Sequence, residues 1–374
     1  MRRLTLTADT VGPVARGHPW VYPDGVHGRA KLGELVDLVD PRGKRVAIGI
    51  GDEGAIAVRV LGTTPMSAEE FIASRLAAAH GRRALVGGDT NAYRVCHGEG
   101  DGLPGLVVDR YDAVWVLKLY ARCWEPHLGT IVNRLVDHGA TTVFRRHGVG
   151  TVNDRDEGET LRGPEPAEAI VVTEHGMKLL ARVRAGQKTG LFLDQREHRR
   201  LVRGWASGRT VVNLFAYNGG FSVAAALGGA RHVTSVDTAA AALDDAREIF
   251  RLNGVDPSQH DFVATDAFAF TGPLSNLVIC DPPSLTRARE ADSAARAAYK
   301  RLHRQVGTYA TDLVATSSCT ARLNNERWEE SVREGLGPGW SWLHRSAEPP
   351  DHPTAFGHPE GRYLKFALCG RRPR

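Results

Sequence analysis

The sequence predicts a doubly wound α/β domain towards its carboxyl end, preceded by a small β-barrel-like module and a middle region of strands with one helix. Three observations lead to this prediction. After about residue 208, apolar strands alternate with helices, a pattern typical of a parallel sheet covered on both faces. Residues 1–62 instead contain short strands cut by turns. A capping box formed by Ser67 and Glu70 then marks the start of a helix.

The composition is that of an ordinary globular protein. Of 374 residues, 42% are hydrophobic and 24% are charged, which excludes a disordered, collagen-like or coiled-coil chain. No apolar run approaches the roughly 18 residues of a membrane span, and residues 1–15 lack the apolar core of a secretion signal. We therefore expect a cytoplasmic protein without membrane contact. The net charge of +5 permits a nucleic-acid partner but does not demonstrate one.

The elements before residue 180 follow from periodicity and turn residues. Turn chemistry at Asp40-Pro41-Arg42-Gly43 separates strands in the first module. Its predicted strands are Gly33–Asp40, Arg45–Ile50 and Ala55–Leu61. The middle region is expected to contain one helix at about residues 125–138. The acidic, Gly- and Pro-punctuated stretch Val152–Pro166 predicts an exposed loop.

The carboxyl-terminal domain is expected to alternate strictly between strands and helices. Its predicted strands are Thr210–Phe215, His232–Val236, Asp261–Ala264, Leu277–Cys280 and a strand within Asp312–Thr320. Its predicted helices lie within Gly219–Gly228 and at Ala239–Leu252. In such a fold the ligand lies beyond the carboxyl ends of the strands.

The first turn between strand and helix contains two adjacent glycines, Gly219 and Gly220, where the backbone can approach a ligand closely. It lacks the G-x-G-x-x-G pattern, which disfavours a nicotinamide dinucleotide. Asp237 and Asp266 follow the next two strands, where carboxylates can accept hydrogen bonds from ribose hydroxyls and from an adenine amino group. This combination predicts a cofactor that contains a nucleoside.

Five cysteines occur without any Cys-x-x-Cys pair, so no metal site is expected, and without a secretion signal they should be reduced. Cys280 precedes Asp281-Pro282-Pro283 at a strand end. Because strand residues alternate between faces, Cys280 should point away from Asp281 and fill the core. Cys319 instead follows a strand in a Ser-Ser-Cys turn at the same edge of the sheet. There a thiol is a candidate nucleophile.

Several motifs, in the same order along essentially the whole chain, resemble the bacterial PUA-domain class I S-adenosylmethionine-dependent methyltransferases. That family includes the 23S rRNA cytosine-C5 methyltransferase. The motifs are Gly17–Tyr22, His97–Gly105, Gly186–Arg196, Asn213–Ser222, Asp281–Pro283, Ser317–Cys319, Asp351–Pro353 and Gly361–Lys365.

The resemblance implies three domains. Residues 1–66 would form a PUA-like RNA-binding domain and residues 67–184 a central α+β domain. Residues 185–374 would form a Rossmann-like class I methyltransferase domain. The cofactor would be S-adenosyl-L-methionine and the partner RNA, namely 23S rRNA; a homodimer is left open.

The resemblance also implies roles for individual residues. Cys319 and Asp281 would be catalytic. The implied cofactor-binding residues are Asn213, Phe215, Tyr217, Gly219, Asp237, Asp266, Ala267 and Asp281. The implied substrate-binding residues are Gln187, Lys188, Phe192, Arg196 and Pro282.

Chemically, cytosine C5 is a poor nucleophile, and attack of a thiolate on C6 activates it for methylation. An enzyme that methylates an amino nitrogen would use an aromatic residue after Asp-Pro-Pro, but here the residue is Ser284, which favours the covalent route. Two alternatives stay open. One is a guanine-N7 or other RNA base methyltransferase on the same scaffold, and the other is a non-enzymatic RNA-binding protein with a degenerate domain.

Overall fold

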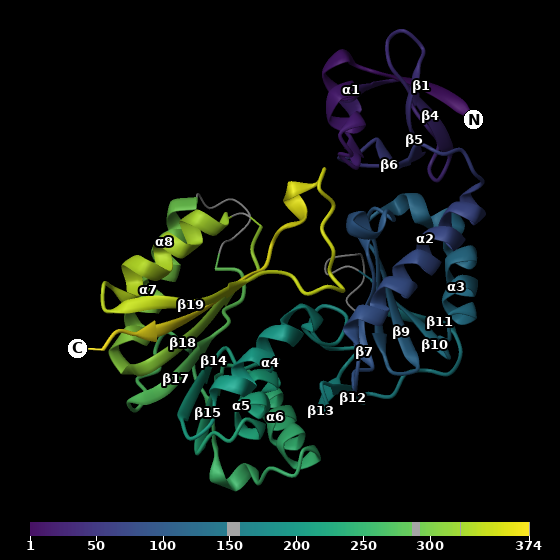
Figure 1. Cartoon of the computed structure of the whole chain (residues 1–374). Helices are drawn as coiled ribbons and strands as arrows, with labels where there is room; N and C mark the ends of the chain where they lie inside the picture. The colour runs from purple at the N-terminus through teal and green to yellow at the C-terminus, as the bar shows by residue number, and fades with distance from the viewer. Residues whose placement is uncertain (148–157, 286–291, 322, 374) are drawn as a thin grey trace. The chain divides into compact units, whose positions relative to one another are not determined.

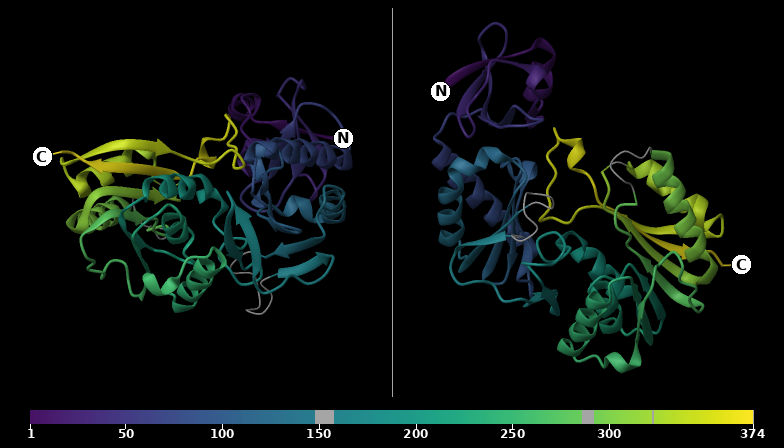
Figure 2. Two further views of the ribbon diagram at one scale, coloured as in Figure 1. Left: turned by 60° about the horizontal axis from the view of Figure 1, so that its bottom comes forward. Right: turned by 180° about the vertical axis from the view of Figure 1, so that it is seen from behind.

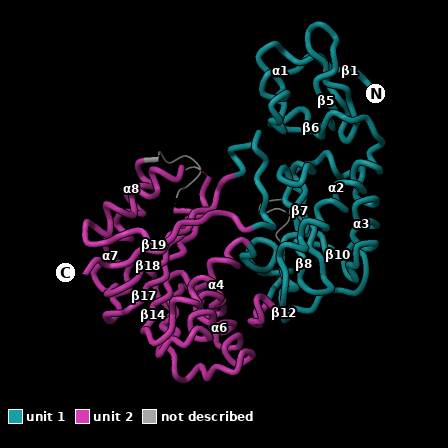
Figure 3. Tube along the Cα trace, viewed as in Figure 1, with its two compact units in different colours: residues 1–172, 181–193, 350–361 teal, residues 173–180, 194–349, 362–374 magenta. Residues whose placement is uncertain are grey.

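A computed structural model describes residues 1–147, 158–285, 292–321 and 323–373 of the chain (Figure 1). The chain divides into two compact units (Figure 3). The first comprises residues 1–172, 181–193 and 350–361, and the second residues 173–180, 194–349 and 362–374. The domain boundaries expected near residues 66 and 184 stay predictions. Among the described residues, no helix is long and apolar enough to cross a membrane.

The first unit begins with a six-stranded sheet in the order β2-β6-β5-β4-β1-β3. The strands are β1 (Arg2–Leu6), β2 (Trp20–Val21), β3 (Val26–His27), β4 (Leu35–Val39), β5 (Arg45–Gly51) and β6 (Val58–Gly62). The three predicted strands correspond to β4, β5 and β6. The prediction of strands alone was wrong at α1 (Ala8–Ala15). This helix is short and fully buries only Val14, so its apolar periodicity is weak.

The same unit contains a five-stranded sheet in the order β11-β10-β9-β8-β7, with two helices. Its elements are α2 (Ala68–Arg82), β7 (Ala92–His97), β8 (Leu106–Tyr111), β9 (Val114–Leu119), α3 (Leu128–Asp137), β10 (Thr142–Arg146) and β11 (Gly158–Arg162). Ser67 caps α2 with the predicted capping box, since its hydroxyl accepts the Glu70 N–H and the Glu70 carboxylate accepts the Ser67 N–H. A two-stranded sheet of β12 (Ile170–Glu174) and β13 (Met177–Ala181) follows.

The loop predicted at Val152–Pro166 needs a partial correction. Gly158–Arg162 forms strand β11, which pairs antiparallel with β10 at the edge of the sheet. The strand is polar, and its pairing comes from a partner distant in sequence, so local alternation does not reveal it. Residues 152–157 of the predicted loop lie outside the described residues.

Motifs from distant parts of the first unit meet in its interior. The indole N–H of Trp20 donates to the Glu99 carboxylate at 2.9 Å, and the ring of His358 lies 4.5 Å from that of Trp20. The backbone N–H of Arg94 donates to Asp351 at 2.9 Å. A Cβ at Gly100 would fall 1.7 Å from the carbonyl oxygen of Pro353, so this position requires glycine. Contacts of residues from three of the motifs, Gly17–Tyr22, His97–Gly105 and Asp351–Pro353, therefore help to hold the unit together.

The second unit is built on a seven-stranded sheet in the order β16-β15-β14-β17-β18-β20-β19. The strands are β14 (Thr210–Leu214), β15 (His232–Asp237), β16 (Asp261–Ala264), β17 (Ser275–Cys280), β18 (Ala310–Ser318), β19 (Trp340–Ser346) and β20 (Lys365–Arg371). The first five strands pair in parallel, as predicted. β20 is antiparallel to β18 and β19 and was not predicted.

Helices cover both faces of this sheet (Figures 1 and 2). They are α4 (Arg196–Trp205), α5 (Gly220–Leu227), α6 (Ala240–Leu252), α7 (Asp292–Tyr309) and α8 (Asn325–Leu336). α4, α5 and α6 lie on one face and α7 and α8 on the other. The predicted helices correspond to α5 and α6. The parallel pairing brings the carboxyl ends of β14 to β18 to one edge of the sheet, which we call the carboxyl edge.

Candidate active site

The loop between β14 and α5 crosses the carboxyl edge in an unusual backbone conformation. Phe215 and Tyr217 have φ values of +58° and +49°, and Gly219 has a φ of +79°. Positive φ costs about 1–3 kcal/mol for a non-glycine residue and persists where the surroundings enforce it, as at ligand clamps. The loop is held by the bond from the Ala216 N–H to the Val236 carbonyl at 2.9 Å.

Gly219 is required by packing as well as by its positive φ. A Cβ on Gly219 would lie 2.6 Å from the Cβ of Ala246 in α6. The sequence predicted a close approach of a ligand at this glycine. In the described structure the close approach is that of a helix, and contact with a cofactor stays a prediction.

Asn213 lies in β14 directly below this loop and is buried. Its amide donates to the Ser222 hydroxyl at 2.9 Å, and Ser235 donates to the same hydroxyl at 2.7 Å. These bonds connect β14, α5 and β15. Its carbonyl oxygen Oδ1 has no hydrogen-bond partner among the described residues.

Asp237 ends β15 and holds the backbone around it. Its carboxylate accepts the N–H of Tyr217 at 2.8 Å and that of Ala239 at 2.9 Å, one on each oxygen. A carboxylate offers about four lone-pair positions, so two backbone bonds leave capacity for hydroxyl donors. The side chain is half-buried. It is therefore suited to accept ribose hydroxyls.

Asp266 follows β16 and is exposed. One of its oxygens accepts the N–H of Phe268 at 2.9 Å, which leaves the other side of the carboxylate towards solvent. Ala267 is buried, and the ring of Phe268 meets that of Phe215 edge-on at 5.9 Å. Carboxylates after successive strands beside aromatic rings fit a cofactor that carries a nucleoside.

Asp281 follows β17 and belongs to a chain of hydrogen bonds. Its Oδ1 accepts from the Gln195 amide at 3.0 Å and from the Ser317 hydroxyl. The Gln195 carbonyl accepts from Nδ1 of His198 at 2.6 Å. Burial lowers the pKa of His198 to about 3, so this histidine is neutral at physiological pH. A neutral imidazole with Nδ1–H orients Gln195, and Gln195 orients Asp281.

Cys319 directly follows β18, two residues beyond Ser317. It is half-buried, whereas the other four cysteines are buried, and none of the five forms a disulfide. Cys280 lies in the core, as predicted, and burial raises the pKa of its thiol. The Tyr299 hydroxyl of α7 donates to Ser318, the last residue of β18, at 2.8 Å. Cys319 is thus the most accessible thiol and lies at the carboxyl edge.

The residues with an implied substrate role divide between the two units. Pro282 and Arg196 are buried in the second unit, and Nε of Arg196 donates to Glu197 at 3.1 Å. Gln187 is exposed in the first unit. There, Nζ of Lys188 lies 4.6 Å from the centre of the Phe192 ring.

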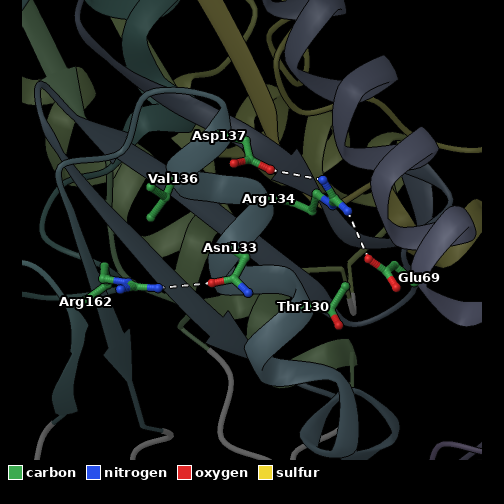
Figure 4. A pocket seen from close by; sticks show the side chains of 7 residues that line it. All are labelled: Glu69, Thr130, Asn133, Arg134, Val136, Asp137 and Arg162. Carbon is green, nitrogen blue, oxygen red and sulfur yellow. Dashed lines mark hydrogen bonds and ion pairs between the residues drawn. The ribbon is translucent and has the colours of Figure 1, made fainter.

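A polar pocket of about 400 Å³ lies elsewhere in the first unit (Figure 4). Arg134 pairs there with Glu69 and Asp137, both at 3.0 Å, and Arg162 donates to Asn133 at 3.1 Å. Two guanidinium groups and two carboxylates balance in charge. The pocket therefore has no net charge to attract an anionic ligand.

Comparison with known proteins identifies the family of the chain. Residues 97–361 match a family model described as S-adenosylmethionine-dependent methyltransferase. The chain belongs to this family. Residues 4–63 match a model of a PUA-like domain. This methyltransferase therefore uses S-adenosylmethionine, to which Asp237 and Asp266 are chemically suited.

Relatives match the methyltransferase over almost its whole length. It is 39% identical to a ribosomal RNA large subunit methyltransferase of Deinococcus radiodurans, over 93% of this chain and 92% of that protein. It is 32% identical to the ribosomal RNA large subunit methyltransferase I of Klebsiella pneumoniae (strain 342), over 98% of both. The crystal structure of SMU.776, a methyltransferase complexed with SAH, shares the fold with a TM-score of 0.87 at 23% identity, over 99% of this chain and 100% of that one.

Sequence reasoning did not identify the residues that support Asp281. Gln195 and Ser317 reach Asp281 through side-chain hydrogen bonds between segments far apart in the chain, and His198 acts on Gln195, three residues before it. Gln195 does lie in the Gly186–Arg196 motif, but the resemblance implied no role for it.

Proposed function

We propose that this methyltransferase forms 5-methylcytosine in the RNA of the large ribosomal subunit through a covalent adduct on Cys319. Two relatives named as ribosomal RNA large subunit methyltransferases, matched over more than nine-tenths of the chain, support the substrate class. The PUA-like module supports an RNA partner, which we expect it to bind. We place the enzyme in the cytoplasm with that substrate.

The observation on which the proposal rests is the position of Cys319. It is half-buried and lies at the carboxyl edge directly after β18, the strand next to β17, which Asp281 directly follows. A thiolate here can attack C6 of a cytosine that has been flipped out of its RNA. The electron pair then makes C5 nucleophilic.

S-adenosylmethionine, when bound, supplies an electrophilic methyl group. The chain's own residues do the rest. Asp281, held by Gln195 and Ser317, can accept the cytosine amino group and hold the ring. After C5 is methylated, loss of its proton to a base restores the double bond and expels the Cys319 thiolate.

The test is Cys319→Ala. We expect turnover to fall to background while the affinity for S-adenosylhomocysteine stays unchanged, because only the attacking group is removed. The measurements are methyl transfer from labelled cofactor to ribosomal RNA, with identification of the methylated nucleoside, and calorimetry. RNA containing 5-fluorocytosine at the target should trap the wild-type enzyme covalently, because C5 then carries no proton to lose.

Cys280→Ala is the matched control, because it removes a thiol buried in the core of the same domain. This variant should still be trapped by the fluorinated RNA. Full activity of Cys319→Ala would exclude the covalent route, and a methylated guanine as the product would identify a different base. Failure of the wild-type protein to bind S-adenosylhomocysteine would contradict the cofactor assignment.

A further inference from the structure

Lys365 is a buried lysine at the start of β20. It is only 3% exposed and lies opposite Ser318 in the antiparallel pairing of β18 and β20. Lysine is almost never buried without a charged partner, because removing an ammonium group from water is costly. A buried lysine beside the turn that carries Cys319 therefore needs an explanation.

The direct partners of Lys365 are uncharged. Its Nζ donates to the carbonyl oxygens of Thr320 at 2.7 Å and Tyr363 at 3.1 Å. The nearby Glu348 carboxylate accepts the backbone N–H groups of Tyr363 and Leu364, at 2.7 and 2.9 Å. Among the described residues Lys365 forms no ion pair. The two carbonyl oxygens accept two of the three N–H donors of its ammonium group.

Cys319 directly precedes Thr320, whose carbonyl accepts from the Lys365 ammonium at 2.7 Å, so the ammonium is held at the turn that carries the thiol. Burial lowers the pKa of Lys365 to about 8, while the charges of Glu348 and Cys319 act to raise it. At neutral pH the ammonium is therefore largely charged. The interaction between two titrating groups is reciprocal. If a thiolate stabilises the charged form of the lysine, the lysine cation stabilises the thiolate by the same free energy.

We propose that the Lys365 ammonium stabilises the thiolate form of Cys319 and holds its turn in place. This inference rests on the proposed function, in which Cys319 is the nucleophile. Lys365 is a positioning residue, since it acts through Cys319 and the adjoining backbone. Its proton stays on Nζ, and the thiol proton leaves to solvent before attack on C6.

Three other ionisable groups of the described residues lie near this turn, Tyr299, Asp281 and Glu348, and these three supply no positive charge. The Tyr299 hydroxyl donates to Ser318, and burial raises the pKa of Tyr299, so it stays neutral. Asp281 and Glu348 are carboxylates and disfavour a nearby thiolate. Among these groups Lys365 is the cation, and removing its charge should make the thiolate harder to form.

The test measures alkylation of Cys319 by iodoacetamide against pH, located by peptide mass spectrometry in the full-length protein. In Lys365→Met the midpoint should rise by about one pH unit, which slows alkylation about tenfold at pH 7. Lys365→Arg keeps the charge and should stay near the wild type. Lys178→Met, which removes an exposed lysine of the same unit, is the matched control and should change nothing.

A second measurement needs no lysine variant. The thiolate absorbance near 240 nm, taken as the difference between wild type and Cys319→Ala, should titrate below the ordinary thiol value of about 8.5. Titration at or above that value overturns the inference, as does an unchanged alkylation midpoint in a folded Lys365→Met protein. If the midpoint shifts but Cys319→Ala stays active, the stabilisation of the Cys319 thiolate by Lys365 stands and the proposed function fails.

Discussion

Among the five cysteines, the position of a cysteine relative to the end of its strand decides whether its thiol is buried in the core or accessible. Cys280 is the last residue of β17 and is fully buried, while Cys319 is the first residue after β18 and is half-buried. The strands β17 and β18 are parallel neighbours in one sheet. A cysteine inside the strand therefore packs in the core, whereas a cysteine just beyond the strand, at the carboxyl edge, is a candidate nucleophile.

Asp237→Ala should weaken the binding of S-adenosylmethionine about 10- to 100-fold, since it removes a charged acceptor for ribose hydroxyls. The carboxylate also anchors the N–H groups of Tyr217 and Ala239, so the loop itself should loosen. Titration calorimetry measures the affinity. Asp237→Asn keeps one acceptor oxygen, so its affinity for S-adenosylmethionine should lie between those of the wild type and Asp237→Ala. Equal affinity in all three proteins would contradict the assignment of Asp237 to the ribose.

The turn from β14 to α5 shows how an element depends on a single glycine. Gly219 combines a φ of +79° with a close approach to Ala246 of α6, so a side chain meets both backbone strain and a clash. Gly208 has a φ of +69° but no atom within 4 Å of its missing Cβ. Comparing alanine variants of Gly219 and Gly208 therefore separates the free-energy cost of backbone strain from that of the clash.

Gly219→Ala should destabilise the protein by about 2–4 kcal/mol, combining the strain of positive φ with overpacking. Gly208→Ala should cost only about 1–2 kcal/mol, from its φ alone. Denaturant unfolding of both variants measures the difference. Equal losses of stability would show that the contact with Ala246 relaxes without cost.

Taken as a whole, the protein carries two histidines inside its second unit that are neutral when folded. Burial lowers the pKa of His198 to about 3 and that of His303 to about 4. His303 contacts the Tyr299 carbonyl at 2.6 Å and the Thr316 hydroxyl at 2.8 Å. In the unfolded chain both rings titrate near pH 6.5. Between these values the unfolded state binds more protons than the folded state.

The free energy of unfolding should therefore be unaffected by these groups above about pH 6.5 and fall as the pH drops below it. Each histidine contributes up to about 1.4 kcal/mol per pH unit, down to pH 4 for His303 and pH 3 for His198. Urea unfolding at pH 7.5, 6.0 and 5.0 measures this slope. His303→Gln should make the slope shallower, and an unchanged slope would contradict the buried neutral state of His303.

Much of this molecule could be predicted from local patterns. The five parallel strands, helices α5 and α6 and the capping box of α2 follow from apolar runs, turn residues and caps, because each signal lies within about 15 residues. The same logic located Asp237, Asp266, Asp281 and Cys319 after strands, and parallel pairing then brings those strand ends to one edge. Helix α1 and strands β11, β19 and β20 were not predicted, since their burial or pairing depends on distant partners.

The supporting contacts around the site came only from the tertiary structure. The hydrogen bond from Gln195 to Asp281 and that from Lys365 to Thr320, beside Cys319, join segments more than 40 residues apart. The reason that Gly219 must be glycine likewise lies in α6. Local sequence indicates which groups stand at the ends of strands. The folded chain decides which polar groups are buried together, and burial determines both their pKa values and their orientation.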